Sequence, residues 1–297
     1  GETARPTRNY ANFRNWTLGA ATTATLRVAV GVLALAALSA SAVAEAASVA
    51  PRDRLLDAVE RHAALPAALG AEIERRCPEA GTRCAAQLIV GSLLAARLVP
   101  VSHPDTDTIR RAHTVPSVSA VERHSDGALV LVLDRFGRTA DREVADAIAA
   151  AGPAEAVRVV LDLRGNAGGD FDRMRRVASL FTGPREGAIR LLGRAGATDV
   201  ALPAPLRAIG EFELDVLIGP GTASSAEVLA ALLRRHAGAR LVGAPTLGKD
   251  WLTRLVPVDH DWRLAIPAER IEVPGETLAQ GLAPDIEATS DERQADE

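Results

Sequence analysis

The chain has 297 residues, of which 47% are hydrophobic but only 3% aromatic, with 34 basic and 38 acidic side chains. This length permits a substantial core in one or two domains, built mainly from Ala, Leu, Val and Ile. The net charge of −4 argues against nucleic acid as a partner, because proteins that bind it usually present a basic surface.

The N-terminal stretch predicts export. Four arginines and one acid in residues 1–27 precede the uncharged run 28–38, and Ala42-Val43-Ala44 fits a signal-peptidase site. We therefore expect residues 1–44 to be a signal peptide and the protein to be periplasmic or secreted. Removal of that segment takes away four arginines and one glutamate, which leaves a net charge near −7. The alternative is a permanent membrane anchor over residues 28–44, because the uncharged stretch is near the lower limit for a span.

Helical patterns, interrupted by prolines, continue from Pro51 to about Arg111, so we expect residues 45–113 to form a helical bundle. Cys77 and Cys84 are the only cysteines, and they bracket a Pro/Gly turn between two helices. In an exported protein this arrangement predicts one disulfide, with two free buried thiols as the alternative.

Residues 114–288 alternate buried strands with helices. Strand patterns at 128–136 and 157–165 enclose a helical pattern at 139–151, and this order predicts a largely parallel sheet covered by helices. The turn RGNAGGD then leads into a helix at 171–181.

Two strand-like runs, 252–258 and 262–274, meet at a polar turn near the C-terminal end. The last residues, 289–297, are acidic and are expected to be disordered.

Ser224 lies where a strand pattern changes into a helix. A glycine-rich turn from Gly219 precedes it, and the apolar spacing from Ser224 to Leu233 is helical. The first N–H groups of a helix lack intrahelical partners and can hold an anion. The alternative for Ser224 is an ordinary helix N-cap.

Lys249 is the only lysine among 34 basic residues. Arginine stays protonated in proteins, whereas lysine can lose its proton when it is desolvated. This contrast predicts that Lys249 acts as a base in a partly buried site, with chance survival of one surface lysine as the alternative. The six histidines are scattered without ligand spacing, and no metal or cofactor is expected.

Four motifs in a fixed order carry a resemblance to a known family. They are GTASSAE followed by Lys249 at 25 residues from Ser224, VVLDLRGNAGG at 159–169, LVGAPTLGK at 241–249 and GLAPDI at 281–286. Together they resemble the C-terminal-processing (tail-specific) serine proteases, the S41 peptidase family. The resemblance implies an α/β (α+β) fold in which a helical bundle precedes a ClpP/crotonase-like protease core.

The resemblance also implies residue roles. Ser224 would be the nucleophile and Lys249 the general base of an exported endopeptidase. Backbone N–H groups of Gly168 or Gly169 and of Ser225 would hold the oxyanion. The expected partners are protein or peptide substrates and not nucleic acid.

The sequence departs from the family pattern at several places. The family's usual SASE reads Ser224-Ser225-Ala226-Glu227 here, so Ser225 is a second candidate nucleophile. Thr253 stands where the family often has a glutamine that orients the lysine, and Arg235 where some members have an aspartate.

No PDZ domain fits between the helical residues and the core strand, which resembles the PDZ-less branch of the family. The core, the bundle, or an activating or adaptor protein would then select substrates. Two other functions stay open: a catalytically inactive periplasmic binding or scaffold protein on the same fold, and a crotonase-like acyl-CoA enzyme.

Overall fold

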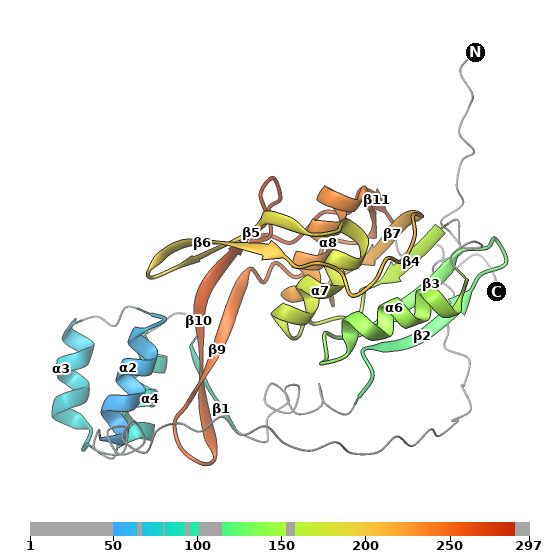
Figure 1. Cartoon of the computed structure of the whole chain (residues 1–297). Helices are drawn as coiled ribbons and strands as arrows, with labels where there is room; N and C mark the ends of the chain where they lie inside the picture. Colours follow the sequence, from blue (N-terminus) through green and yellow to red (C-terminus); the bar gives the residue numbers. More distant parts are fainter. Residues whose placement is uncertain are drawn as a thin grey trace, which may run out of the picture. The chain divides into compact units, whose positions relative to one another are not determined.

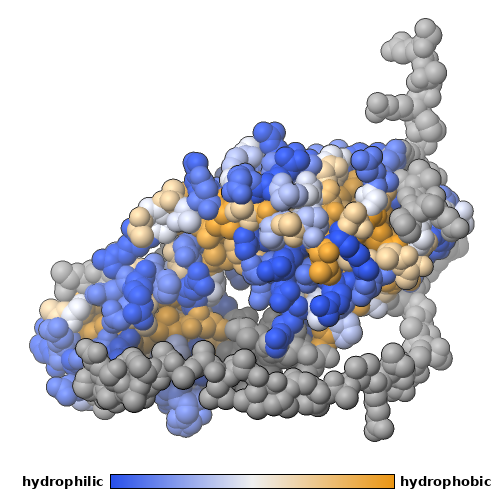
Figure 2. Space-filling view, in the orientation of Figure 1, coloured by the Kyte–Doolittle hydropathy of each residue, from blue (hydrophilic) through white to orange (hydrophobic). Residues whose placement is uncertain are grey.

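The structure, a computed structural model, describes residues 50–63, 67–79, 81–92, 96–100, 115–152 and 158–288. The expected signal peptide or anchor and the acidic tail lie outside these ranges. Within them, no helix is long and apolar enough to cross a membrane. Hydrophilic side chains dominate the face in Figure 2, with smaller apolar areas between them.

A six-stranded sheet forms the centre of the fold (Figure 1). Its strand order is β11-β8-β7-β4-β3-β2, and every neighbouring pair is parallel except β2 with β3. The strands are β2 (Val118–Arg123), β3 (Leu129–Leu133), β4 (Arg158–Asp162), β7 (Glu213–Ile218), β8 (Arg240–Gly243) and β11 (Ile286–Glu287). The largely parallel sheet expected from the sequence is confirmed.

Three helices follow strands of this sheet: α6 (Ala140–Ala150) after β3, α7 (Phe171–Thr182) after β4, and α8 (Ser225–Ala237) after β7. Neighbouring helices contact one another, α6 with α7 and α7 with α8, so they cover one face of the sheet. Asp170 caps α7 by accepting a hydrogen bond from the Arg173 N–H (2.9 Å). The apolar sides of the helices join the main hydrophobic cluster together with strands β3, β4 and β7.

A second, antiparallel sheet contains β1 (Arg97–Pro100), β5 (Arg185–Gly193), β6 (Gly196–Leu202), β9 (Trp251–Pro257) and β10 (Trp262–Glu272). β10 pairs with β9 along one edge and with β1 and then β5 along the other. β9 and β10 form the long hairpin coloured orange in Figure 1. The two strand-like runs expected near the C-terminus are therefore confirmed.

Helices α2 (Pro51–Glu60), α3 (Ala67–Arg76) and α4 (Thr82–Ser92) share a second hydrophobic cluster with the β9–β10 hairpin. Val256 and Leu264 from the hairpin are buried in this cluster. At the hairpin tip, Arg83 pairs with Asp259 (2.9 Å) and lies over the Trp262 ring at 5.5 Å. The helices are thus attached to a hairpin that begins beside Lys249.

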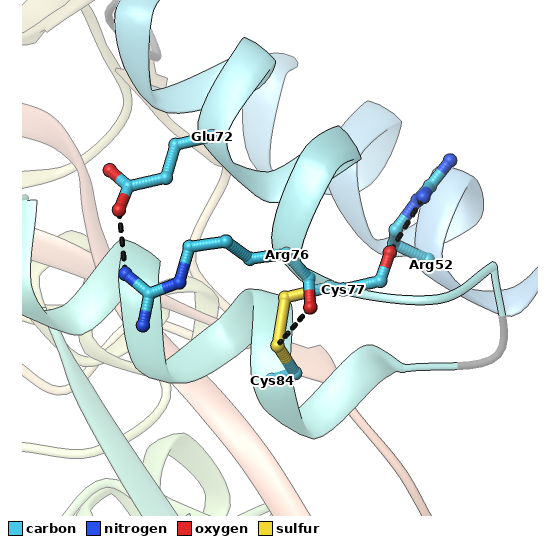
Figure 3. The surroundings of a disulfide bond; sticks show 5 residues. All are labelled: Arg52, Glu72, Arg76, Cys77 and Cys84. Carbon is cyan, nitrogen blue, oxygen red and sulfur yellow. Dashed lines mark hydrogen bonds and ion pairs between the residues drawn. A yellow bond between two sulfur atoms is a disulfide. The ribbon is translucent and has the colours of Figure 1, made fainter.

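The predicted disulfide between Cys77 and Cys84 is present (Figure 3). It joins the end of α3 to α4, and Arg52 from α2 donates a hydrogen bond to the Cys77 carbonyl (2.9 Å). The bond and this contact hold the three helices at one point.

The helical expectation fails from Arg97 to the break expected at Pro100. These residues form β1, because they pair antiparallel with Trp262 to Ala265 of β10. The β5–β6 hairpin and the antiparallel strand β2 were also not predicted. In each case pairing with a distant strand decides the local structure, and a single-sequence pattern does not carry that information.

Candidate active site

One cleft of about 890 Å³ lies between the turns that lead into helices α7 and α8 on one side and the start of β9 on the other. Its walls include every residue that the sequence singled out for catalysis: Gly168, Gly169, Ser224, Ser225, Lys249 and Thr253. They come from the turn after β4, from the junction between β7 and α8, and from the segment around the start of β9, and the fold brings these three segments together. Among the described residues, no histidine lines this cleft.

Ser224 occupies a strained backbone position. It follows the turn after β7 and directly precedes α8, and its φ of 57° makes it the only residue other than glycine with a positive φ in the described ranges. Such a conformation costs about 1–3 kcal/mol and persists only where the surroundings enforce it. A sharp strand-to-helix turn of this kind exposes a serine hydroxyl at the end of a parallel sheet.

Hydrogen bonds from neighbouring turns enforce this conformation. The buried Thr222 hydroxyl donates to the Leu163 carbonyl (2.8 Å), and the Ala223 N–H donates to the Asn166 carbonyl (3.0 Å). The Ser224 N–H donates to the Glu227 carboxylate (2.7 Å). The serine turn is therefore tied to the glycine turn after β4 and to the first turn of α8.

The glycine turn lies against Ser224. A Cβ on Gly168, whose φ is +106°, would lie 3.1 Å from the Ser224 Cβ. A Cβ on Gly169, whose φ is +145°, would lie 2.8 Å from the backbone N and O of Phe136. Only glycine fits both the angles and the space, so the backbone can approach the serine closely.

Asn166 decides which glycine N–H is free. Its side chain is fully buried, donates to the Leu133 carbonyl (2.8 Å) and accepts from the Gly168 N–H (2.8 Å). No group in the described parts of the chain accepts a hydrogen bond from the Gly169 N–H. The geometry therefore leaves Gly169, not Gly168, as the available donor of this turn.

Ser225 is placed differently from Ser224. Its side chain is buried, at 1% exposure, and its hydroxyl donates to the Gly169 carbonyl (3.1 Å). Its N–H belongs to the first residue of α8, where helical N–H groups lack intrahelical acceptors. The hydroxyl thus holds the glycine turn, while the N–H remains able to contact an anion.

Glu227 links the serine to the lysine. This buried carboxylate accepts from the Ser224 N–H and the Lys249 N–H on one oxygen, at 2.7 and 2.8 Å. Its other oxygen accepts from the Gly248 N–H and the Thr246 hydroxyl, both at 2.6 Å. All four partners are donors, so both oxygens act as acceptors, as in a carboxylate.

Lys249 is fixed through its backbone on both sides. Glu227 holds its N–H, and the next residue, buried Asp250, accepts from Arg270 through its side chain (2.7 Å) and from the Ile271 N–H through its carbonyl (2.6 Å). In the described part of the chain, no carboxylate forms an ion pair with the Lys249 ammonium group.

Thr253 and Arg235, at which the sequence departs from the family pattern, lie in different parts of the structure. Thr253 lies exposed in β9 and lines the cleft. Arg235 lies instead near the end of α8, beside Gly275 and away from the cleft.

Charges of both signs line the cleft. Asp134, Asp172 and Arg254 are among them. Hydrogen bonding from Arg175 lowers the pKa of Asp172 below its ordinary value, so this carboxylate stays ionised near neutral pH.

Asn166 and Glu227 were not selected from the sequence. Both lie inside motifs that were recognised, VVLDLRGNAGG and GTASSAE, but their roles depend on partners from other turns. The sequence did offer a signal for both residues: each is a polar residue next to a glycine turn or a helix start, inside a recognised motif.

A sequence model of peptidase family S41 matches residues 128–288, more than half of the chain. The chain is 27% identical over 217 residues to the chloroplastic carboxyl-terminal-processing peptidase 3 of Arabidopsis thaliana. The matched stretch covers 68% of this chain and 42% of that protein. It is 26% identical over 178 residues to the carboxy-terminal processing protease CtpA of Bacillus subtilis, covering 59% and 38%.

A solved lipoprotein from Streptococcus agalactiae has a similar fold, with a TM-score of 0.61 at 12% identity over 81% of this chain and 93% of that one. The matched region spans less than half the length of the two processing proteases.

Proposed function

Because this chain belongs to peptidase family S41, we propose that it is an exported serine endopeptidase with Ser224 as nucleophile and Lys249 as general base. Residues 114–288 form its protease core, and its substrates are polypeptides. The observation that carries the proposal is the strained Ser224 turn, which shares one cleft with Lys249 and with a glycine turn.

The reaction is acyl transfer. Neutral Lys249 takes the proton of the Ser224 hydroxyl, and the serine oxygen attacks the peptide carbonyl carbon. The tetrahedral intermediate then collapses, the C–N bond breaks, and the protonated lysine gives its proton to the leaving amine. Water hydrolyses the resulting ester by the same proton transfers and regenerates the serine.

The oxyanion receives hydrogen bonds from the N–H groups of Gly169 and Ser225. Gly168 is the weaker candidate, because its N–H already donates to Asn166. The buried Ser225 hydroxyl favours Ser224 as the nucleophile, because Ser225 is engaged with Gly169 and lies inside the turn. The Thr253 hydroxyl is proposed to orient the Lys249 amine from β9.

The test uses the full chain with three variants: Ser224→Ala, Ser225→Ala and Lys249→Ala. Intact-mass labelling by a fluorophosphonate and cleavage of unfolded casein are followed from pH 6 to 10. We expect labelling and cleavage in the native protein, loss of both in Ser224→Ala, and loss of cleavage in Lys249→Ala. Because the proposed base acts in its neutral form, cleavage should rise with pH over this range. Ser225→Ala should still be labelled and should still cleave casein, because it retains Ser224.

Two outcomes contradict the proposal. Undiminished cleavage by Lys249→Ala removes the lysine from the reaction. Absence of both labelling and cleavage in the folded native protein favours the inactive binding or scaffold protein on the same fold.

A further inference from the structure

Strand β9 presents a backbone edge to the cleft. It pairs with β10 along one edge, and no strand of the described residues pairs with the other. Four consecutive residues, Trp251 to Arg254, line the same cleft as Ser224. Successive side chains of a strand point to opposite faces, so four in a row line one cleft only when the strand's edge faces it.

The pairing of β9 with β10 shows which backbone groups face outward. Thr253 lies opposite Pro267. Opposed residues of an antiparallel pair exchange either two backbone hydrogen bonds or none, and proline has no N–H to exchange. The Thr253 N–H and carbonyl therefore point away from β10, toward the unpaired edge.

The hydrogen bonds at the closed end of the hairpin give the same alternation of inward and outward backbone groups, independently of Pro267. The Val258 N–H donates to the Trp262 carbonyl (3.1 Å), so that pair is bonded to β10. Counting back two residues at a time places Val256 and Arg254 in bonded pairs, and Thr253 and Leu255 between them. Both derivations assign an outward donor and acceptor to Thr253.

Unpaired strand edges attract other strands, and proteins usually cover, shorten or charge them. Here the free edge starts two residues after Lys249 and opens into the cleft that contains Ser224. An extended polypeptide bound there would satisfy the outward backbone groups and lie beside the serine at the same time. Recognition by strand addition depends on backbone groups and so tolerates many sequences.

We propose that the polypeptide substrate binds as an added β-strand on the outer edge of β9, with one substrate residue exchanging two backbone hydrogen bonds with Thr253. This inference rests on the proposed peptidase function. It identifies the substrate as a locally unfolded, extended segment, and it makes the Thr253 backbone a binding group in addition to any role of its hydroxyl.

The first test is an N-methyl scan of a peptide that the protein cleaves, or of a casein segment if none is cleaved. Each backbone amide is methylated in turn, and binding to full-length Ser224→Ala is measured by fluorescence anisotropy. Strand addition predicts an alternating pattern: methylation of an amide that donates to β9 raises the Kd at least about fivefold. Methylation of the amides on either side has much less effect.

Cleavage by the native protein is measured with the same peptides, so that the two proposals separate. Alternating binding without cleavage supports the β9 edge and contradicts the peptidase function. Cleavage with a uniform or absent methylation effect supports the peptidase and overturns strand addition. A native protein that neither binds nor cleaves any peptide overturns both.

The matched protein variants are Thr253→Pro and Thr253→Ala. Both remove the hydroxyl, but only proline also removes the outward N–H, and edge strands accept proline where the N–H faces outward. We expect the Kd of the proline variant to be at least about fivefold higher than that of the alanine variant. Equal Kd values would overturn the proposal, and the N-methyl scan decides it if the proline variant does not fold.

Discussion

Replacing Glu227 by glutamine tests whether this carboxylate holds the two proposed catalytic residues in place. In the structure its two oxygens accept four hydrogen bonds, from Ser224, Lys249, Gly248 and Thr246. Glutamine keeps one acceptor oxygen but replaces the other by an NH₂ group. That NH₂ group would face two donors, whichever way the amide is turned.

The magnitude follows from this count. A hydrogen bond to a charged group contributes about 1.5–3 kcal/mol, so losing two costs about 3–6 kcal/mol. Domains are stable by only about 5–15 kcal/mol, and a loss near 3 kcal/mol lowers the Tm by about 10 °C in a chain of this size. Because Ser224 and Lys249 lose their common anchor, we expect kcat to fall by about 10²-fold.

Glu143→Gln is the matched control. Glu143 in α6 also accepts two backbone N–H bonds on one oxygen, from Ser117 (2.6 Å) and Val118 (3.0 Å), but neither of these partners lines the cleft. Both variants are compared by thermal unfolding followed by circular dichroism, and by kcat and KM well below their midpoints. The control should lose stability while its folded fraction keeps the native kcat.

The reasoning is refuted if Glu227→Gln keeps the native kcat, or if both variants lose kcat to the same extent. The thermal unfolding measurement tests the stability estimate separately from the effect on kcat. An unchanged Tm in Glu227→Gln would mean that the four hydrogen bonds contribute far less than their number indicates.

Three further predictions follow from single features. Gly169→Ala should lower kcat by about 10²-fold or more, because its Cβ would lie 2.8 Å from the Phe136 backbone; a native kcat in steady-state assays contradicts this. Burial, with two neighbouring arginines, lowers the pKa of His236 below 6.5. The contribution of His236 to the free energy of unfolding is therefore complete at a pH above its pKa in the unfolded chain, and it is lost as the pH falls through its pKa in the folded protein. The Tm of the native protein should therefore fall more between pH 7.5 and 5.5 than that of His236→Gln, and equal slopes would contradict this. Reducing the Cys77–Cys84 bond should lower the free energy of unfolding by about 2 kcal/mol, measured by urea unfolding with and without reductant; identical midpoints would show that the bond adds nothing.

The sequence by itself identified the features that depend on local patterns. The strand-to-helix junction at Ser224, the glycine turn and the single lysine at Lys249 were all readable from residue type and spacing, and the structure places them in one cleft. The Cys77–Cys84 pair was readable as well, because it spans one short turn. In these cases the residues that matter to each other lie close in the chain, or belong to motifs of fixed order.

Only the tertiary structure decided the features that depend on distant partners. β1 is a strand because β10 pairs with it, Ser225 is buried because it reaches Gly169, and Glu227 joins two turns about 20 residues apart. The outward edge at Thr253 likewise follows from Pro267 on the opposite strand. Hydrogen bonds and burial between remote segments exist only after the chain has folded, so residue type and spacing alone do not specify them.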